Sequence, residues 1–358
     1  MKQILVTGGA GFIGTNFIRY VHRNRQDWHI VNLDALTYAG NPGNHRNLEK
    51  DPRYTFVHGN ICDGDLVTSL FDQYRFDGVF HFAAESHVDR SIAGPDVFVK
   101  TNVTGTFVLL DAALAHVRRH KDKKFRFVHV STDEVYGSLG IDEPAFTETT
   151  AYDPSSPYSA SKAASDHLVK AWYRTFGLPV IVTNCSNNYG PYQFPEKLIP
   201  LMVLNCLDNQ PLPVYGNGKN IRDWLYVTDH CDALVRACER GIPGETYNIG
   251  GGEEKTNLEV VETVCDIVDE KTGKQPGTSR NLITFVQDRP GHDLRYAINP
   301  DKSYEKIGYK AGFSFDQALS VTVDWYLENM EWVKSVQTGA YREWIRTHYR
   351  RGQERLEK

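Results

Sequence analysis

The stretch that decides the fold is KQILVTGGAGFIG, which runs from Lys2 to Gly14. Its first part, Lys2–Thr7, predicts a short buried strand. The second part, Gly8–Gly14, predicts a tight turn in which backbone amides can approach a pyrophosphate at the start of the next helix. A glycine-rich turn is a weak signal by itself, and the spacing Gly-x-x-Gly-x-x-Gly departs from the common dinucleotide pattern. The context strengthens it, because an amphipathic helical segment, Phe12–His22, follows the turn.

An acidic residue ends the next predicted strand. Asp34 directly follows His29–Leu33 and lies 20 residues after Gly14. A carboxylate at this position binds the two ribose hydroxyls of NAD and repels the 2′-phosphate of NADP. No arginine follows immediately to accept such a phosphate, and the alternative is an aspartate that caps a turn. We therefore expect the cofactor to be NAD.

Predicted strands and helices alternate through the first half of the chain. Strands are expected at Tyr54–His58, Asp77–Phe82 and Phe125–Val130, with a helix near Asp65–Tyr74 between the first two. This alternation predicts an α/β fold with a doubly wound, Rossmann-like, mainly parallel sheet.

The alternation weakens after Asn184, where loops rich in Pro, Gly and Asn appear. This shift predicts a smaller mixed α/β domain that closes over a ligand. We expect an NAD-binding domain at residues 1–189, to which residues 224–246 return. A discontinuous substrate-binding domain is expected at residues 190–358.

Two polar segments are candidates for one site. The segment Thr132–Glu134 falls at or just past the carboxyl end of the strand Phe125–Val130, where open α/β sheets place their ligands. Tyr158 and Lys162 are four residues apart at the start of a predicted helix, so they share one face. A neighbouring ammonium favours the phenolate of a tyrosine, whose free pKa is about 10. The pair fits a catalytic base, although a packed tyrosine and an ordinary surface lysine are the commoner explanation of a lone Tyr-x-x-x-Lys, and only the other signals in the chain favour the base.

Other polar positions leave two interpretations open. The small residues Ala83 and Ala84 would let the backbone approach the cofactor, and the polar run after them either orients a sugar or stays solvated. Thr101 either caps a helix or lines the nicotinamide side. Arg222 and Arg295 present planar forks that match a diphosphate, or form surface salt bridges with neighbouring aspartates.

Composition excludes several classes of protein. The net charge of −5 in 358 residues gives no electrostatic footprint for nucleic acid. We expect no signal peptide, and the apolar run Ile4–Val6 is too short to span a membrane. The 6 cysteines lack any Cys-x-x-Cys and the 13 histidines lack His-Glu-x-x-His. This pattern predicts reduced thiols in a cytoplasmic protein and no metal site.

Several of these signals agree with one family. Gly8–Gly14, Asp34, Ser131-Thr132 and Tyr158 with Lys162 together resemble the extended short-chain dehydrogenase/reductase family of nucleotide-sugar enzymes. Longer matches, spread over nearly the whole chain, resemble the 4,6-dehydratases of that family. They lie at FAAESHVDRS (82–91), STDEVYG (131–137), NCSNNYGPYQFPEKLIP (184–200), RDW (222–224) and RPGHDLRY (289–296).

The resemblance implies catalytic roles for Thr132, Asp133, Glu134, Tyr158 and Lys162. Tyr158, assisted by Thr132, takes the proton of the sugar 4-hydroxyl as hydride passes to NAD, and Lys162 holds the phenolate. Glu134 then removes the C5 proton, and protonated Asp133 releases the C6 hydroxyl as water. The hydride returns to C6, Glu134 reprotonates C5, and NAD stays bound throughout. Related 4-epimerases carry small residues at the two carboxyl positions, and the decarboxylases carry a serine before the glutamate, so this pair distinguishes dehydration.

The resemblance also implies two sets of ligand contacts. The cofactor contacts are Gly8, Gly11, Phe12, Ile13, Gly14, Asp34, Leu36, Thr37, Asn60, Ile61, Ala83, Ala84, Ser86, Thr101, Tyr158, Lys162 and Asn187. The substrate contacts are Ser86, His87, Thr132, Asn187, Glu196, Lys197, Leu198, Pro213, Val214, Tyr215, Arg222, Asn257, Arg289, His292, Arg295 and Tyr296. Asn60 departs from the family, where aspartate is usual, and we expect a modestly altered cofactor affinity from it.

The implied substrate is dTDP-glucose, on the way to a deoxysugar such as rhamnose. UDP-glucose is the close alternative, since the contacts that read the base are the least legible part of the sequence. The alternative from another class is a non-catalytic NAD-binding sensor, which would not need to retain all of Asp133, Glu134, Tyr158 and Lys162. The family also suggests a homodimer packed through the helices near Val99–Ala115 and Tyr158–Phe176.

Overall fold

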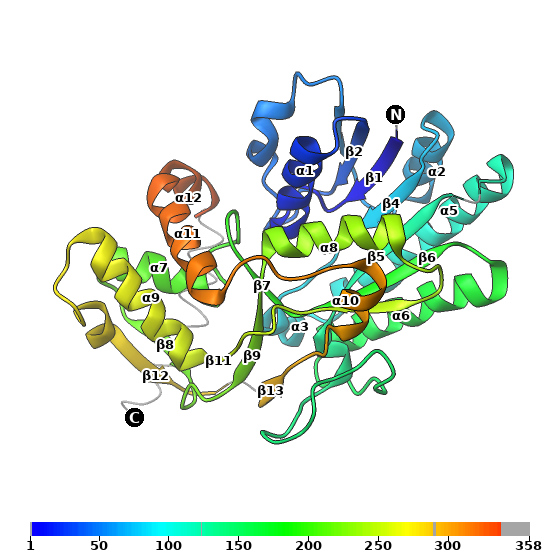
Figure 1. Cartoon of the computed structure of the whole chain (residues 1–358). Helices are drawn as coiled ribbons and strands as arrows, with labels where there is room; N and C mark the ends of the chain where they lie inside the picture. Colours follow the sequence, from blue (N-terminus) through cyan, green and yellow to red (C-terminus); the bar gives the residue numbers. More distant parts are fainter. Residues whose placement is uncertain (1, 123, 289–290, 338–358) are drawn as a thin grey trace.

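The larger lobe of the molecule is built on one parallel sheet of seven strands (Figure 1). The structure is a computed structural model and describes residues 2–122, 124–288 and 291–337. The strand order is β10-β6-β5-β4-β1-β2-β3, and every neighbouring pair is parallel. The strands are β1 (Lys2–Thr7), β2 (Trp28–Asp34), β3 (Tyr54–His58), β4 (Gly78–His81), β5 (Arg126–Thr132), β6 (Val180–Cys185) and β10 (Thr246–Ile249). This order confirms the predicted doubly wound, Rossmann-like fold.

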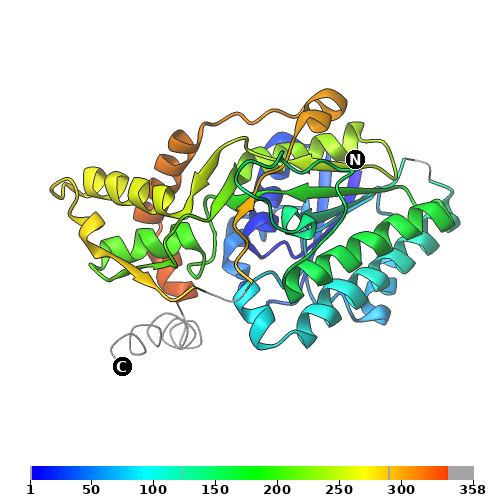
Figure 2. The same cartoon turned by 90° about the horizontal axis from the view of Figure 1, so that it is seen from below.

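Helices cover both faces of this sheet, which explains why its strands are almost continuously apolar. On one face α1 packs against α8, over a core that includes Ile4 and Val6 of β1. On the other face α2, α5 and α6 pack over Leu5, and Figure 2 shows α5 and α6 side by side. These helices are α1 (Phe12–Asn24), α2 (Gly64–Gln73), α5 (Thr106–His120), α6 (Pro157–Phe176) and α8 (Val227–Arg240).

Shorter helical pieces connect the strands of the larger lobe. They are η1 (Pro42–Leu48), α3 (Val88–Ala93), α4 (Asp96–Phe98), η2 (Val99–Gly105) and η3 (Asp133–Tyr136). Within the described ranges, the continuous helical stretch Asp96–His120 is the one that by length and composition alone could cross a membrane. In this fold the stretch packs against α2 and α6 as part of a helical layer.

The smaller lobe has its own apolar core between helices and short strands. Its helices are α7 (Leu198–Leu207), α9 (Asn257–Thr272), η4 (Ser279–Leu282), α11 (Phe315–Glu328) and α12 (Met330–Val336). Its strands are β7 (Asn187–Tyr189), β8 (Leu212–Tyr215), β9 (Ile221–Tyr226), β11 (Glu254–Thr256), β12 (Ile283–Val286) and β13 (Arg295–Tyr296). β9 pairs with β7, β11 and β13, whereas β8 pairs with β12.

The chain crosses between the lobes several times. The expected return at residues 224–246 contains α8 and the first residue of β10, while Trp224–Tyr226 lie in β9 of the smaller lobe. Later in the chain, α10 (Asp301–Ile307) packs on α8 and β10 of the larger lobe. Of the proposed substrate-binding domain, residues 338–358 lie outside the described residues.

Candidate active site

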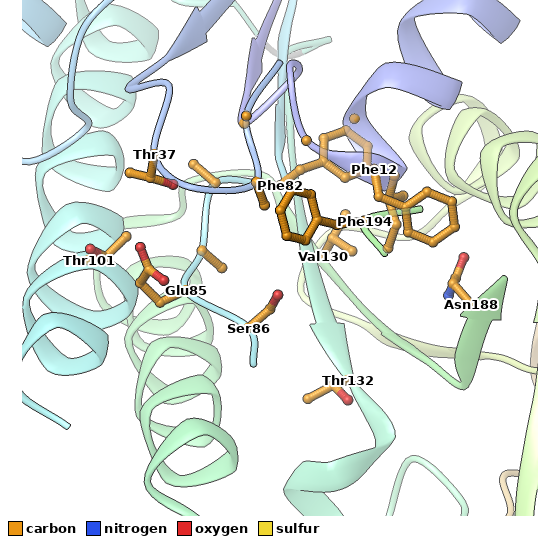
Figure 3. Close-up of a pocket in the computed structure, with 18 of the residues that line it drawn as sticks. Phe12, Thr37, Phe82, Glu85, Ser86, Thr101, Val130, Thr132, Asn188 and Phe194 are labelled. Atoms are coloured by element: carbon orange, nitrogen blue, oxygen red, sulfur yellow. The ribbon is translucent and has the colours of Figure 1, made fainter. Parts of the chain in front are cut away.

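A cavity of about 320 Å³ lies at the carboxyl ends of the central strands of the larger sheet. Open α/β sheets bind their ligands at this place. Its walls come from the glycine-rich turn, the loops after β2 and β4, the end of β5, the start of α6 and residues 185–197. In Figure 3, Glu85 and Ser86 lie on one side of β5, Asn188 lies on the other, and Thr132 lies at the carboxyl end of the strand.

The glycine-rich turn needs glycine for close backbone packing. Gly8 has a φ of +72°, and a Cβ there would lie 2.6 Å from the backbone nitrogen of Ala83. A Cβ at Gly14 would lie 2.3 Å from the carbonyl oxygen of Gly8. The helix α1 begins after Gly11 with no side-chain cap on its first amides, and Gly11 lines the cavity. Uncapped amides at a helix start suit a phosphate group.

Asp34 joins this turn to the loop after β2. Its side chain is 7% exposed, and its two oxygens accept hydrogen bonds from the amides of Ala10 and Leu36, each at 2.8 Å. Burial raises the pKa of Asp34, and the two amide hydrogen bonds act against that rise. The carboxyl lines the cavity and fits the hydroxyls of a ribose. Together with the uncapped amides of α1, these residues fit a dinucleotide such as NAD.

Most of the expected cofactor residues line this one cavity. They are Gly8, Gly11, Phe12, Ile13, Gly14, Asp34, Thr37, Asn60, Ile61, Ala83, Ala84, Ser86, Thr101, Tyr158, Lys162 and Asn187. Leu36 is absent from the lining of the cavity. Its backbone N–H donates a hydrogen bond to the carboxylate of Asp34, which does line it.

Thr132, Asp133 and Glu134 lie where β5 gives way to η3. The Thr132 hydroxyl accepts the amide hydrogen of Glu134 at 3.3 Å and begins the turn. Asp133 is 1% exposed, and within the described part of the chain its Oδ2 has no hydrogen-bond partner. Burial raises the pKa of Asp133 well above its usual range, and the charges of Glu134 and Asp223 raise it further. These surroundings favour the protonated form of Asp133.

Tyr158 lies in the first turn of α6, with its side chain buried at the cavity. Burial raises the pKa of Tyr158 well above 10, and the neighbouring Glu134 raises it further. Lys162 donates to the carbonyl of Val130 at 2.9 Å. In this arrangement desolvation and the nearby carboxylates dominate the pKa of Tyr158, and the role expected of Lys162 stays a prediction.

A buried polar network lies beneath Lys162. Asp166, one helical turn further along α6, accepts hydrogen bonds from Ser131 at 2.8 Å and from the Tyr152 hydroxyl at 2.9 Å. Its other oxygen lies 3.1 Å from Nε2 of His129, which is in turn 3.4 Å from Nζ of Lys162. Burial lowers the pKa of Lys162 and lowers the pKa of His129 to about 4. Sequence reasoning missed Asp166, although its spacing of four from Lys162 places it on the same helix face.

A second buried carboxylate connects the lobes. Glu196 is 2% exposed and accepts hydrogen bonds from Nε and Nη2 of Arg90 at 3.2 and 3.0 Å. His87 Nε2 lies 3.8 Å from the other oxygen of Glu196. The Arg90 guanidinium lies over the ring of Tyr38 at 3.8 Å. Arg90 and Tyr38 were not predicted, since their pairing is visible only once the loop after β4 meets the segment around Glu196.

The remaining expected substrate residues divide between this cavity and the smaller lobe. Ser86, Thr132, Asn187, Glu196 and Lys197 line the cavity. The residues outside its lining are His87, Leu198, Pro213, Val214, Tyr215, Arg222, Asn257, His292, Arg295 and Tyr296. Arg289 lies outside the described residues.

The two arginines expected to bind a diphosphate have different surroundings. The Arg222 guanidinium lies over the ring of Tyr296 at 4.2 Å, and its charge acts to lower the pKa of Asp133. Arg295 forms hydrogen bonds with both oxygens of Glu254 at 2.6 and 2.8 Å and donates to the carbonyl of Glu143. The Arg222 guanidinium also donates to protein groups, the carbonyls of Ile221 at 2.7 Å and Asp293 at 2.9 Å, so both arginines are engaged within the protein.

No group of three or more His, Cys, Asp or Glu side chains that could hold a metal ion occurs within residues 2–122, 124–288 and 291–337.

Comparison with known sequences places the chain among nucleotide-sugar enzymes. The family model described as GDP-mannose 4,6 dehydratase matches residues 5–322. The dTDP-glucose 4,6-dehydratase of Salmonella typhimurium is 54% identical over 358 residues, covering 97% of this chain and 99% of that protein. The corresponding protein of Neisseria meningitidis is 56% identical over 348 residues, covering 96% and 98%.

Solved structures give the same result. The dTDP-glucose 4,6-dehydratase of Bacillus anthracis, in complex with NAD, superimposes with a TM-score of 0.83 at 47% identity and covers 94% of this chain and 100% of that one. The dTDP-glucose 4,6-dehydratase of Streptomyces venezuelae, with NAD and dTDP bound, gives a TM-score of 0.85 at 46% identity and covers 93% and 99%.

Proposed function

The chain belongs to the GDP-mannose 4,6-dehydratase family, and we propose from this premise that it is an NAD-dependent dTDP-glucose 4,6-dehydratase. The observation that carries the proposal is the pair Asp133 and Glu134, which lies beside Tyr158 at the end of β5. Oxidation of a sugar hydroxyl needs only a base and a hydride acceptor. Removal of water from the neighbouring carbons also needs a second base and an acid, which the two carboxyls provide.

Oxidation at C4 of the sugar is the first task of the site. NAD held by the glycine-rich turn and Asp34 would supply the hydride acceptor for C4 and the hydride donor for C6. Tyr158 takes the proton of the 4-hydroxyl, and Thr132 holds that hydroxyl at the end of β5. The positive charge of an oxidised nicotinamide ring beside Tyr158 would favour the phenolate that the surrounding carboxylates disfavour. Lys162, buried and bonded to Val130, adds a second positive charge on the same side.

Elimination follows because the 4-keto group acidifies the C5 proton. Glu134 removes that proton, and the C6 hydroxyl leaves as water with the proton of Asp133. The surroundings of Asp133 suit this role, because burial and the neighbouring carboxylates raise its pKa and so favour the protonated acid. Glu134 then returns its proton to C5, so the product is a 4-keto-6-deoxy sugar and the cofactor ends as it began.

Incubation of the purified protein with dTDP-glucose and no added NAD tests this proposal. We expect a product that is lighter than the substrate by one water. Mass spectrometry and the absorbance of the keto sugar in alkali detect this product. Equal kcat/KM values for UDP-glucose and dTDP-glucose would contradict the proposed preference for the dTDP sugar but would not contradict the proposed reaction. Failure of both sugars to react, even with NAD supplied, would favour a non-catalytic NAD-binding sensor.

The enzyme acts in our proposal as a cytoplasmic homodimer. The six cysteines form no disulfide bond with one another, which suits a reducing compartment. The partner surface is the outer face of the helices near Val99–Ala115 and Tyr158–Phe176, where Val99, Phe107 and Phe176 are 54, 44 and 44% exposed. Exposed apolar side chains gathered on adjacent helices are typical of a subunit interface.

The variant Phe107→Glu tests the dimer surface. We expect it to shift sedimentation equilibrium toward the monomer, because a buried charge would oppose association. The control is Phe285→Glu, at an equally exposed phenylalanine of β12 in the smaller lobe. Equal dissociation of both variants, or of neither, would contradict this surface.

A further inference from the structure

One hydrogen bond joins the last described helix to the loop beside the glycine-rich turn. The indole Nε1 of Trp332 in α12 donates to Oδ1 of Asn44 in η1 at 2.6 Å, across 288 positions of sequence. Asn44 is 4% exposed, so this bond satisfies a polar group that water does not reach.

The side-chain nitrogen of Asn44 forms hydrogen bonds with the glycine-rich turn and the start of α1. Its Nδ2 donates to the carbonyl of Ala10 at 3.2 Å and to the hydroxyl of Thr15 at 2.9 Å. Thr15 in turn donates to the carbonyl of Gly9 at 3.2 Å. Asn44 therefore connects two points of the turn, one before α1 and one in its first turn.

Trp332 and the carbonyl of Ala10 together fix which way the Asn44 amide points. An indole N–H can only donate, so it must meet the oxygen of the amide. The amide nitrogen is then directed at Ala10 and Thr15, where acceptors stand. Without the indole, the oxygen of the buried Asn44 amide would lose its donor, and the amide would be held less firmly against Ala10 and Thr15.

The same helix also packs on the wall of the cavity. Trp332 and Val336 form an apolar cluster with Phe194, Tyr38 and Ala39, and the last three of these line the cavity. Tyr38 and Ala39 follow Asp34 closely in sequence, so this contact lies on the side that fits the adenosine half of a dinucleotide. The helix α12 of the smaller lobe thus holds both the turn and the loop after β2.

We propose that Trp332 is a positioning residue for the cofactor, which through Asn44 keeps the glycine-rich turn in its pyrophosphate-binding shape and so slows release of NAD. The inference rests on the proposed function, because NAD is the ligand it concerns. The proposed reaction uses and restores the same NAD within each turnover, so a device that delays release costs the enzyme nothing in rate.

Release of bound NAD from the purified protein tests the inference. Trp332→Phe removes the N–H and keeps a ring in the cluster, and Asn44→Ala removes the connecting amide. We expect each variant to release NAD about three- to tenfold faster than the parent, which is the range for one hydrogen bond. The double variant should release NAD no faster than Asn44→Ala alone, because both changes interrupt one connection. The control is Trp325→Phe, in the same aromatic cluster.

Two outcomes would overturn the inference. One is release from Trp332→Phe at the parental rate or at the rate of the Trp325→Phe control. The other is an additive effect in the double variant, which would mean that Trp332 acts by general packing. An NAD-free parent that cannot be loaded would instead overturn the proposed function, so the two failures are distinguishable.

Discussion

Asp133 and Glu134 are adjacent in sequence, but their surroundings in the folded protein differ. The side chain of Asp133 turns into a fully buried site near Asp223, whereas Glu134 is partly exposed at the cavity. The sequence places both residues at the end of a strand and so predicts their location. It contains no signal for the surroundings that raise the pKa of Asp133, because Asp223 approaches from a strand 90 residues later.

The variant Asp133→Asn separates the acid from the rest of the chemistry. An amide of the same shape cannot give a proton to the leaving hydroxyl, so we expect product formation to fall by about a hundredfold or more. Oxidation at C4 needs only Tyr158 and should continue. Absorbance of the reduced cofactor should therefore accumulate in stopped flow when dTDP-glucose is added. Unchanged product formation would contradict the role of Asp133.

The variant Tyr158→Phe removes the base for C4. We expect kcat to fall by about a hundredfold or more, with no accumulation of reduced cofactor, since the first step itself is blocked. Tyr173→Phe, on the exposed side of the same helix, is the control and should keep the parental kcat. A near-normal kcat in Tyr158→Phe would contradict the proposal that Tyr158 is the base that accepts the proton of the 4-hydroxyl.

Arg295 marks a limit of residue-level prediction. Arginine near an expected diphosphate is a reasonable candidate by its geometry alone. Its actual partners, Glu254 and the carbonyl of Glu143, come from distant segments that the sequence does not bring together. The Trp332–Asn44 bond escaped prediction for the same reason.

At the scale of the element, α6 shows how local signals place catalytic groups. Pro157 occupies the first helical position and Ser156 forms a capping box with Ser159. Gly177, at a φ of +74°, ends the helix. Tyr158 therefore lies in a turn whose geometry is set by the cap, and a helix over this region was predictable from local residues.

The variant Ser156→Ala tests this coupling of cap and site. Loss of the cap should cost about 1 kcal/mol of unfolding free energy. Because the first turn carries Tyr158, we also expect kcat to fall several-fold. Ser314→Ala removes the equivalent capping box of α11, remote from the cavity, and should cost similar stability with full activity. Equal activity of the two variants would show that the cap does not position Tyr158.

The elements of the two lobes differ in how predictable they are. Strands such as β1 and β3 are five or six residues long and rich in apolar, aromatic or β-branched residues, and their expected bounds match the structure. The strand β13 has two residues and exists because it pairs with β9, whose partner residues lie 74 positions earlier in the sequence. Strand β8 contains Pro213, which argues against a strand by local rules. Long-range pairing, rather than local preference, forms the smaller lobe.

At the scale of the whole molecule, the two lobes share one set of functional groups. Glu196 and Arg90, like Trp332 and Asn44, are contacts between segments assigned to different domains. A division at residue 189 assigns β7, which pairs with β9, to the first domain and α10, which packs on α8 and β10, to the second, so the exact domain bounds stay a prediction. The sequence predicts two lobes through a change in composition, but only the folded chain shows how often it crosses between them.

Stability of the whole molecule should depend on pH through buried histidines. Burial lowers the pKa of His45 and His129 from 6.5 to about 4 and that of His230 to about 3. Each is neutral in the folded state, whereas in the unfolded chain it takes up a proton below pH 6.5. A depressed folded-state pKa therefore means stability that is complete above pH 6.5 and is lost as pH falls toward 4. Asp223, whose pKa burial raises to about 6, acts in the opposite direction.

The variant His230→Gln isolates one of these protons, since the contributions of the other groups cancel on comparison with the parent. His230 is wholly buried, and its Nδ1 lies 2.9 Å from Oδ1 of Asn188, a bond that glutamine can replace in part. Between pH 6 and 4 the unfolding free energy of the parent should fall more steeply than that of the variant, by about 1.4 kcal/mol per pH unit. Urea unfolding at several pH values measures both slopes, and His167→Gln, at an exposed histidine, controls for loss of an imidazole. If the slope of His230→Gln equals that of the parent, His230 takes up its proton in the folded state and its burial does not set the acid limit of the enzyme.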